Sequence, residues 1–72
     1  MAPSWAAELS PEVVSTLRTF VANDLNVVRT APALGVHANT VRYRLDRVAE
    51  LTGRNPRRFL DLVDVLAAIA LA

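Results

Sequence analysis

The stretch Val36-His37-Ala38-Asn39-Thr40-Val41-Arg42-Tyr43-Arg44-Leu45 decides the fold of this 72-residue chain. It follows Gly35, and glycine often ends helices because it adopts positive φ without a steric penalty. His37 precedes a run with the periodicity of a helix and can act as its N-cap. The sequence therefore predicts a tight turn at residues 35–37 and a helix over 38–52. The core-facing side of that helix is marked by apolar spacing at Val41, Leu45, Val48 and Thr52.

Two shorter helices are predicted upstream of the turn. Ser10 as N-cap and Pro11 at the first helical position begin a helix over about 11–23, and Asn26 can cap a second one over 27–34. Pro32 removes a backbone hydrogen bond inside the second helix, so we expect it to be kinked or split there. The expected inward residues are Val13, Leu17, Phe20 and Val21 in the first helix, and Val27, Val28, Ala31 and Leu34 in the second.

A fourth helix is predicted over 59–71, after a linker at 54–58. Its polar side is marked only by Asp61 and Asp64, and a helix so apolar around its circumference usually has a second neighbour. We therefore expect a homodimer through this helix or through missing upstream domains. The expected inward stripe is Phe59, Leu62, Val63, Leu66, Ile69 and Ala70, with Leu60, Val65 and Leu71 on its flanks.

Four short helices joined by tight turns predict an all-α domain that contains a helix-turn-helix unit. We expect residues 1–72 to form one domain, cut from the C-terminal end of a longer protein. Residues 1–9 would be an upstream linker or helix remnant, in which Trp5 and Leu9 pack onto the domain.

Composition excludes several functional classes. The chain has no cysteine and one histidine, which excludes disulfides and makes a multi-ligand metal site or a bound cofactor unexpected. No nucleophile or carboxylate is spaced to work with His37, so we expect no enzyme activity and no small-molecule ligand in this fragment. No secretory signal begins the chain, and its longest apolar run, at 65–72, is far short of the about 20 residues that span a bilayer. These features predict a cytoplasmic protein without membrane contact.

Positive charge is concentrated in one segment. Residues 42–58 hold six arginines against Asp46 and Glu50, a net charge of +4, whereas the rest of the chain carries −3. A basic segment on an otherwise acidic small domain indicates a polyanionic partner, here double-stranded DNA. The absence of lysine is equally consistent with the codon bias of a GC-rich genome.

The predicted helix over 38–52 offers side chains suited to a DNA major groove. Asn39, Arg42 and Tyr43 would project from its first two turns, and Asn and Arg can pair with adenine and guanine edges. The N–H groups of the first turn would be free to meet a phosphate. Three alternatives stay open, since His37 can act mainly as the cap, Tyr43 can pack against the preceding helix, and the arginines of the linker can be ordinary solvated charges. The candidate DNA-binding residues are His37, Asn39, Thr40, Arg42, Tyr43, Arg44 and Arg47, with Arg54, Arg57 and Arg58 as candidate phosphate contacts.

The string from Val36 to Leu45, followed by Arg47-Val48 and Glu50-Leu51-Thr52-Gly53, resembles the C-terminal helix-turn-helix domain of the PucR/CdaR family of bacterial transcriptional regulators. The upstream Leu17-Arg18-Thr19-Phe20 and the apolar last helix also match in order and spacing. The resemblance implies the DNA-reading end of a longer regulator whose upstream part senses a metabolite, such as a purine breakdown product or a sugar diacid. It implies DNA contact at His37, Asn39, Thr40, Arg42, Tyr43 and Arg44.

Two other readings compete with sequence-specific DNA binding. A helical protein-interaction or dimerisation module would explain the apolar last helix and the net charge near zero, but not the arginine segment that follows a glycine turn. A non-specific architectural DNA binder would need no base-reading side chains, and Asn39 and Arg42 argue against it.

Overall fold

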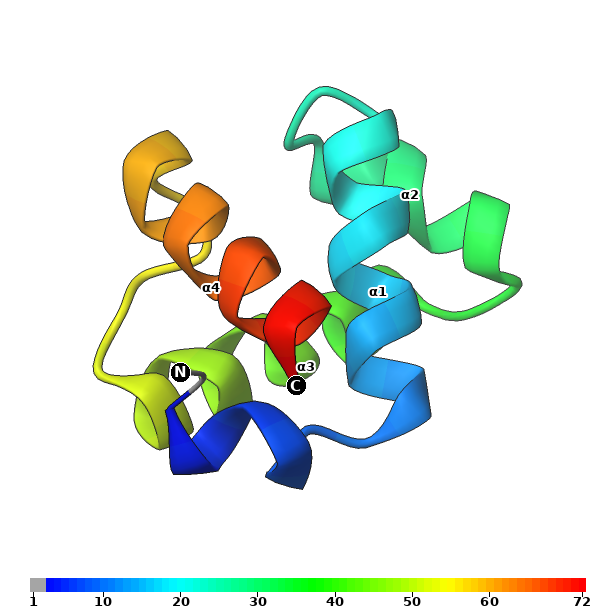
Figure 1. Ribbon diagram of the computed structural model, residues 1–72. Coiled ribbons are helices and arrows are strands. Elements are labelled where there is room, and N and C mark those ends of the chain that lie inside the picture. Colours follow the sequence, from blue (N-terminus) through cyan, green and yellow to red (C-terminus); the bar gives the residue numbers. More distant parts are fainter. Residues whose placement is uncertain (1–2) are drawn as a thin grey trace.

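The computed structural model describes residues 3–72, and within them every regular element is a helix. A short 3-10 helix, η1 (Ser4–Glu8), precedes α1 (Pro11–Ala22), α2 (Val27–Leu34), α3 (Ala38–Thr52) and α4 (Phe59–Leu71). Figure 1 shows α1 and α4 in front of α3, with η1 at the bottom of the view. The all-α prediction and its four helices are confirmed, and the first helix ends one residue earlier than expected, at Ala22.

The predicted N-caps are all confirmed. A cap side chain accepts a backbone N–H of the first turn, which otherwise lacks a partner, and so fixes where the helix begins. The three caps are Ser10 Oγ with the Val13 N–H at 3.3 Å, Asn26 Oδ1 with the Arg29 N–H at 3.0 Å, and His37 Nδ1 with the Asn39 N–H at 3.1 Å.

The turn between α2 and α3 depends on Gly35, which adopts a φ of 69°. Its N–H donates to the Pro32 carbonyl at 3.1 Å, and the Val36 N–H donates to the Ala31 carbonyl at 3.0 Å. The predicted split of α2 at Pro32 is wrong, because the helix runs unbroken from Val27 to Leu34. Pro32 lies exposed near the C-terminal end, where the turn supplies hydrogen bonds that offset the single missing one.

The core lies where α1, α2 and α3 meet, and it is closed by α4 and η1. Trp5 packs against this core and Leu9 belongs to it, so the expected packing of both residues is confirmed. Met1 and Ala2, the first residues of the expected upstream remnant, lie outside the described residues. The buried apolar cluster is Leu9, Leu17, Phe20, Ala31, Val41, Leu45, Val48, Leu62 and Val65.

Within residues 3–72, three polar side chains are buried, and each donates its hydroxyl proton to the backbone carbonyl four residues earlier. Thr16, Thr30 and Thr52 donate to the carbonyls of Glu12, Asn26 and Val48, all at 2.7 Å. This bond removes the penalty of burying an unpaired hydroxyl. Thr16 and Thr30 face inward although neither was among the expected inward residues, which instead included Val21 and Val28. That expectation is wrong, since Val21 and Val28 are exposed.

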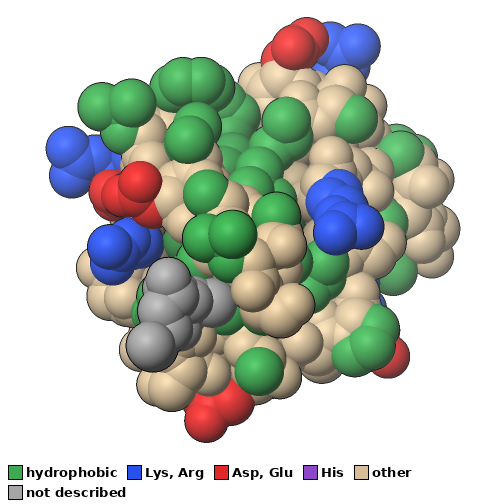
Figure 2. All heavy atoms as spheres, in the orientation of Figure 1, with side chains coloured by type: hydrophobic (Ala, Val, Ile, Leu, Met, Phe, Trp, Pro, Cys, Tyr) green, Lys and Arg blue, Asp and Glu red, His purple; other side chains and the backbone are tan. Residues whose placement is uncertain are grey.

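The rotation of α4 about its axis differs from the predicted one. Val65, expected on a flank, is fully buried, whereas Phe59, Val63 and Ala70, expected inside, are exposed. Polar contacts on one side of the helix accompany this rotation: Asp61 Oδ2 accepts the Asn55 N–H at 3.1 Å, and Asp64 Oδ2 lies 3.6 Å from Arg54 Nε. As a result, apolar side chains gather on the outer surface over α4 (Figure 2). Leu62, Leu66 and Ile69 face inward as predicted.

No helix within residues 3–72 combines the length and the apolar character needed to cross a bilayer.

Candidate nucleic-acid interface

The unit formed by α2, the Gly35 turn and α3 has the arrangement of a helix-turn-helix. The two helices pack against each other through Ala31 and Val41, which are both buried, while Val36 in the turn packs against the same cluster. Val41, Leu45, Val48 and Thr52 form the buried side of α3, as predicted. The opposite side of α3 is therefore left for solvent or a partner.

His37 is the cap of α3, as predicted, and its side chain is exposed. Two of the expected free N–H groups of the first turn are engaged, because the Asn39 N–H donates to His37 Nδ1 and the Thr40 N–H donates to the His37 carbonyl at 2.9 Å. Phosphate recognition at this end of α3 would therefore depend on side chains more than on the backbone.

Asn39 and Arg42 lie one turn apart on the exposed side of α3, and Arg42 Nη1 donates to Asn39 Oδ1 at 2.9 Å. The sequence had suggested two independent base-reading side chains. Their spacing of three residues, which places them on one helix face, was the available signal that they could bond to each other. The two side chains form one exposed polar unit at the start of the helix.

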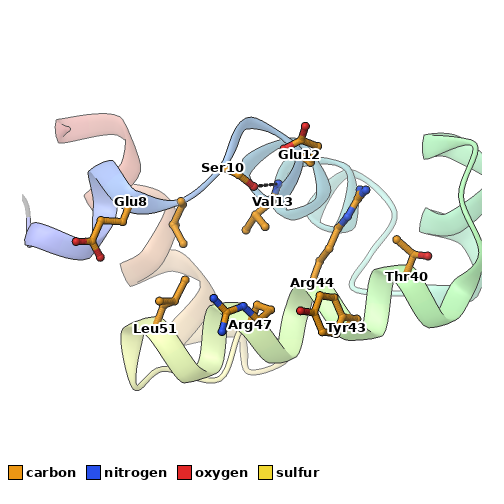
Figure 3. A pocket seen from close by; sticks show the side chains of 10 residues that line it. Glu8, Ser10, Glu12, Val13, Thr40, Tyr43, Arg44, Arg47 and Leu51 are labelled. Atoms are coloured by element: carbon orange, nitrogen blue, oxygen red, sulfur yellow. Dashed lines mark hydrogen bonds between the residues drawn. The ribbon is translucent and has the colours of Figure 1, made fainter.

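Tyr43 and Thr40 line a groove of about 590 Å³ between α3 and the start of α1 (Figure 3). Tyr43 is 64% exposed, which leaves its ring accessible rather than packed against α2. The groove has an apolar floor and charged edges of both signs. Its lining is Glu8, Leu9, Ser10, Glu12 and Val13 on one side, and Thr40, Tyr43, Arg44, Arg47 and Leu51 on the other.

Arg44 differs from the other predicted contacts because its side chain extends from α3 toward α1 (Figure 3). Arg44 Nη1 donates to Thr16 Oγ1 at 3.1 Å, and the Arg44 side chain is half-buried. Sequence reasoning missed Thr16 altogether. The available signal was a hydroxyl residue directly beside the apolar stripe of the first helix.

Several arginines of the basic segment are paired with carboxylates. Arg47 Nη1 lies 3.1 Å from Glu50 Oε2, and Arg57 Nη1 lies 3.0 Å from Asp46 Oδ1. Arg54 is paired with Asp64 of α4, as described above. Among residues 3–72, Arg58 is exposed and has no carboxylate within ion-pair distance. The positive charge of the six arginines is thus partly neutralised within the domain, although all of these pairs are solvent-accessible and can exchange partners.

The interface shows no sign of a metal centre. Within residues 3–72, the His, Asp and Glu side chains form no group of three or more that could hold an ion. The polar side chains of α3 can donate hydrogen bonds to phosphates and base edges, which is recognition chemistry rather than catalysis.

The family model of the PucR C-terminal helix-turn-helix domain matches residues 13–71. The chain belongs to this family. The matched segment takes in α3, the turn before it and nearly all of the other three α-helices. Membership makes this a helix-turn-helix domain of PucR-type transcriptional regulators, which implies a DNA-binding role in regulation.

Curated relatives agree with this family. The chain is 49% identical over 47 residues, 65% of its length, to the transcriptional activator PmfR of Paenarthrobacter nicotinovorans. It is 40% identical over 58 residues, 81% of its length, to the protein YsfB of Bacillus subtilis. It is 36% identical over 56 residues, 78% of its length, to the carbohydrate diacid regulator of Escherichia coli. These matches cover 10%, 16% and 14% of the three relatives, and no solved structure matches the chain.

Proposed function

We propose that this PucR-type domain binds DNA sequence-specifically, with α3 inserted in the major groove. The bonded pair of Asn39 and Arg42 carries this proposal, because it presents hydrogen-bonding groups for base edges on the exposed first turns of α3. Such amide and guanidinium groups are the ones that discriminate bases in the major groove. Their position near the start of the second helix of the unit is where recognition helices contact bases.

The neighbouring side chains have supporting roles in this proposal. Thr40, Tyr43 and Arg47 border the reading pair on the groove side and would contact phosphates or the groove wall. His37 would act first as the cap and also lie close to the DNA backbone. The linker arginines would extend the phosphate footprint: Arg58 directly, and Arg54 and Arg57 once their exposed ion pairs exchange carboxylate for phosphate.

The whole protein is proposed to be a longer, metabolite-responsive, cytoplasmic regulator of which residues 1–72 form the C-terminal, DNA-reading domain. The relatives support this, since the matches cover only 10–16% of their lengths and one of them is named a carbohydrate diacid regulator. The effector would bind outside this fragment.

A homodimer is proposed as the functional form, through α4 or through upstream domains. The outer stripe of α4 consists of Leu60, Val63, Ala67 and Ala70, all exposed. If two copies pair antiparallel, Leu60 and Val63 of one copy would pack against Ala67 and Ala70 of the other. Leu60→Glu should then convert the wild-type dimer to a monomer in sedimentation. A wild-type domain that already sediments as a monomer, and that the substitution leaves unchanged, would exclude this face as the interface.

Selection from random DNA followed by gel-shift measurements tests the proposed function. We expect an enriched operator, to which Arg42→Ala binds about 5- to 150-fold more weakly, since one good base contact contributes about 1–3 kcal/mol. Arg18→Ala is the matched control, because Arg18 is exposed on α1 and lies on the side of that helix away from Thr16.

The wild-type affinity should also fall steeply with salt, because several phosphates are neutralised on binding. Failure to enrich any sequence, or equal binding by Arg42→Ala and wild type, would contradict the assignment of α3 as the reading helix. An affinity insensitive to salt would favour the protein-interaction module instead.

A further inference from the structure

Arg44 makes a contact that links the two helices on either side of the groove. Its Nη1 donates to Thr16 Oγ1 at 3.1 Å, across 28 positions of sequence. Within residues 3–72 it is the side-chain hydrogen bond that joins α3 to α1, and Thr16 is 0% exposed. Because its Thr16 end is buried, this part-buried bond is less open to water than the exposed pairs on α3.

The hydrogen-bonding capacity of Thr16 fixes the direction of this contact. A threonine hydroxyl has one proton, and Thr16 donates it to the Glu12 carbonyl at 2.7 Å. The remaining lone pairs can only accept, and Arg44 supplies the donor. The Thr16 hydroxyl therefore both donates and accepts, the contact uses one of the five N–H donors of Arg44, and no buried side-chain polar atom of the described residues lacks a partner.

The surroundings of Arg44 are unfavourable for a phosphate. Arg44 borders two grooves, of about 590 and 380 Å³, and Glu12 lines both of them. Figure 3 shows Glu12 and Arg44 at the same end of the larger groove, with Glu8 further along it. A phosphate that approached the Arg44 guanidinium from either groove would also approach the Glu12 carboxylate, and like charges repel.

We propose that Arg44 is a positioning residue that sets the orientation of α3 on α1 through Thr16, and that it does not contact DNA. This inference rests on the proposed function, and it changes the role that the family resemblance implies for Arg44. Through this bond, a residue of α1 that cannot reach DNA controls how Asn39 and Arg42 are presented to the bases.

Two substitutions that remove the bond from opposite ends test the inference. Thr16→Val removes the hydroxyl at nearly constant volume, and Arg44→Met removes the guanidinium while keeping an apolar stem. We expect both to weaken binding to the selected operator by a similar factor, on the order of tenfold, with no further loss in the double variant. Thr16→Ser keeps the hydroxyl and should restore near wild-type binding.

The salt dependence separates positioning from phosphate contact. Each phosphate contact contributes about 0.9 to the slope of log K against log salt, so both variants should keep the wild-type slope while their preference for operator over random DNA falls. A slope reduced by about one in Arg44→Met, with wild-type binding by Thr16→Val, would overturn the inference. Circular dichroism at the assay temperature shows whether the variants are folded, and a loss of affinity that tracks unfolding in both variants also overturns the inference.

If Thr16→Val does not fold, Arg44→Met keeps the proposal testable, because Arg44 is only half-buried. The salt slope of Arg44→Met alone then decides between positioning and phosphate contact. Failure of the proposed function gives a different pattern, in which wild type selects no operator or Arg42→Ala binds like wild type. Loss of binding in Arg42→Ala, together with intact binding in Thr16→Val and Arg44→Met, refutes the positioning role alone.

Discussion

Asn39 and Arg42 should lose their contributions to operator binding together rather than independently. Arg42 Nη1 donates to Asn39 Oδ1 at 2.9 Å, so truncating either side chain also frees the other. Hydrogen bonds to charged groups contribute about 1.5–3 kcal/mol, and water competes at an exposed site, so we take about 1 kcal/mol for the coupling. Each residue adds its own base contact of about 1–3 kcal/mol.

A double-mutant cycle measures this coupling. Operator affinity is determined by fluorescence anisotropy for wild type, Asn39→Ala, Arg42→Ala and the double variant. We expect the double variant to lose about 1 kcal/mol less than the two single losses added together, which is about a fivefold difference in affinity. Single losses that add within about 0.3 kcal/mol would show that the pair does not act as one unit on DNA.

Four further substitutions probe the scaffold and its charge. Gly35→Ala should lower the free energy of unfolding by about 1 kcal/mol in thermal melts, since φ is 69° but no atom lies within 4 Å of the added Cβ; a gain in stability would contradict this. In urea unfolding, Val65→Ala should lower the free energy of unfolding by about 2 kcal/mol, and Val63→Ala should lower it by less than about 1 kcal/mol. Equal losses would mean that α4 does not bury Val65 in preference to Val63. Asp46→Asn frees Arg57 and should tighten DNA binding at low salt while changing stability by at most about 1 kcal/mol; unchanged affinity would place Arg57 away from DNA.

The features that could be predicted from sequence are those with local causes. Ser10, Asn26 and His37 cap their helices through residues two or three positions away, and Gly35 is needed for a turn that only a positive φ permits. The inward side of α3 was predictable because polar residues occupy its other side. The family signature itself lies within this locally determined stretch.

The features that could not be predicted depend on distant partners. The apolar residues of α4 surround nearly the whole helix, so the hydropathy pattern does not determine its rotation. The contacts of Asp61 and Asp64 with Asn55 and Arg54 of the linker accompany the rotation that is observed. Arg44 finds its partner 28 residues away, and no periodicity within one helix reveals such a contact. Val28 was misplaced because the short α2 buries only a narrow stripe, which includes Thr30 in place of a second valine.

The separation of the two faces of α3 bears on how such regulators can diverge. Asn39 and Arg42 are exposed and bonded to each other, so substitution there leaves Val41 and Leu45 undisturbed beneath them. Under the proposed function, new operator preferences could therefore arise by exchanging these two surface residues without new mutations in the core. Arg44 does not share this freedom, because a change there must be matched on α1. The same scaffold is for that reason a practical starting point for designing altered DNA specificity.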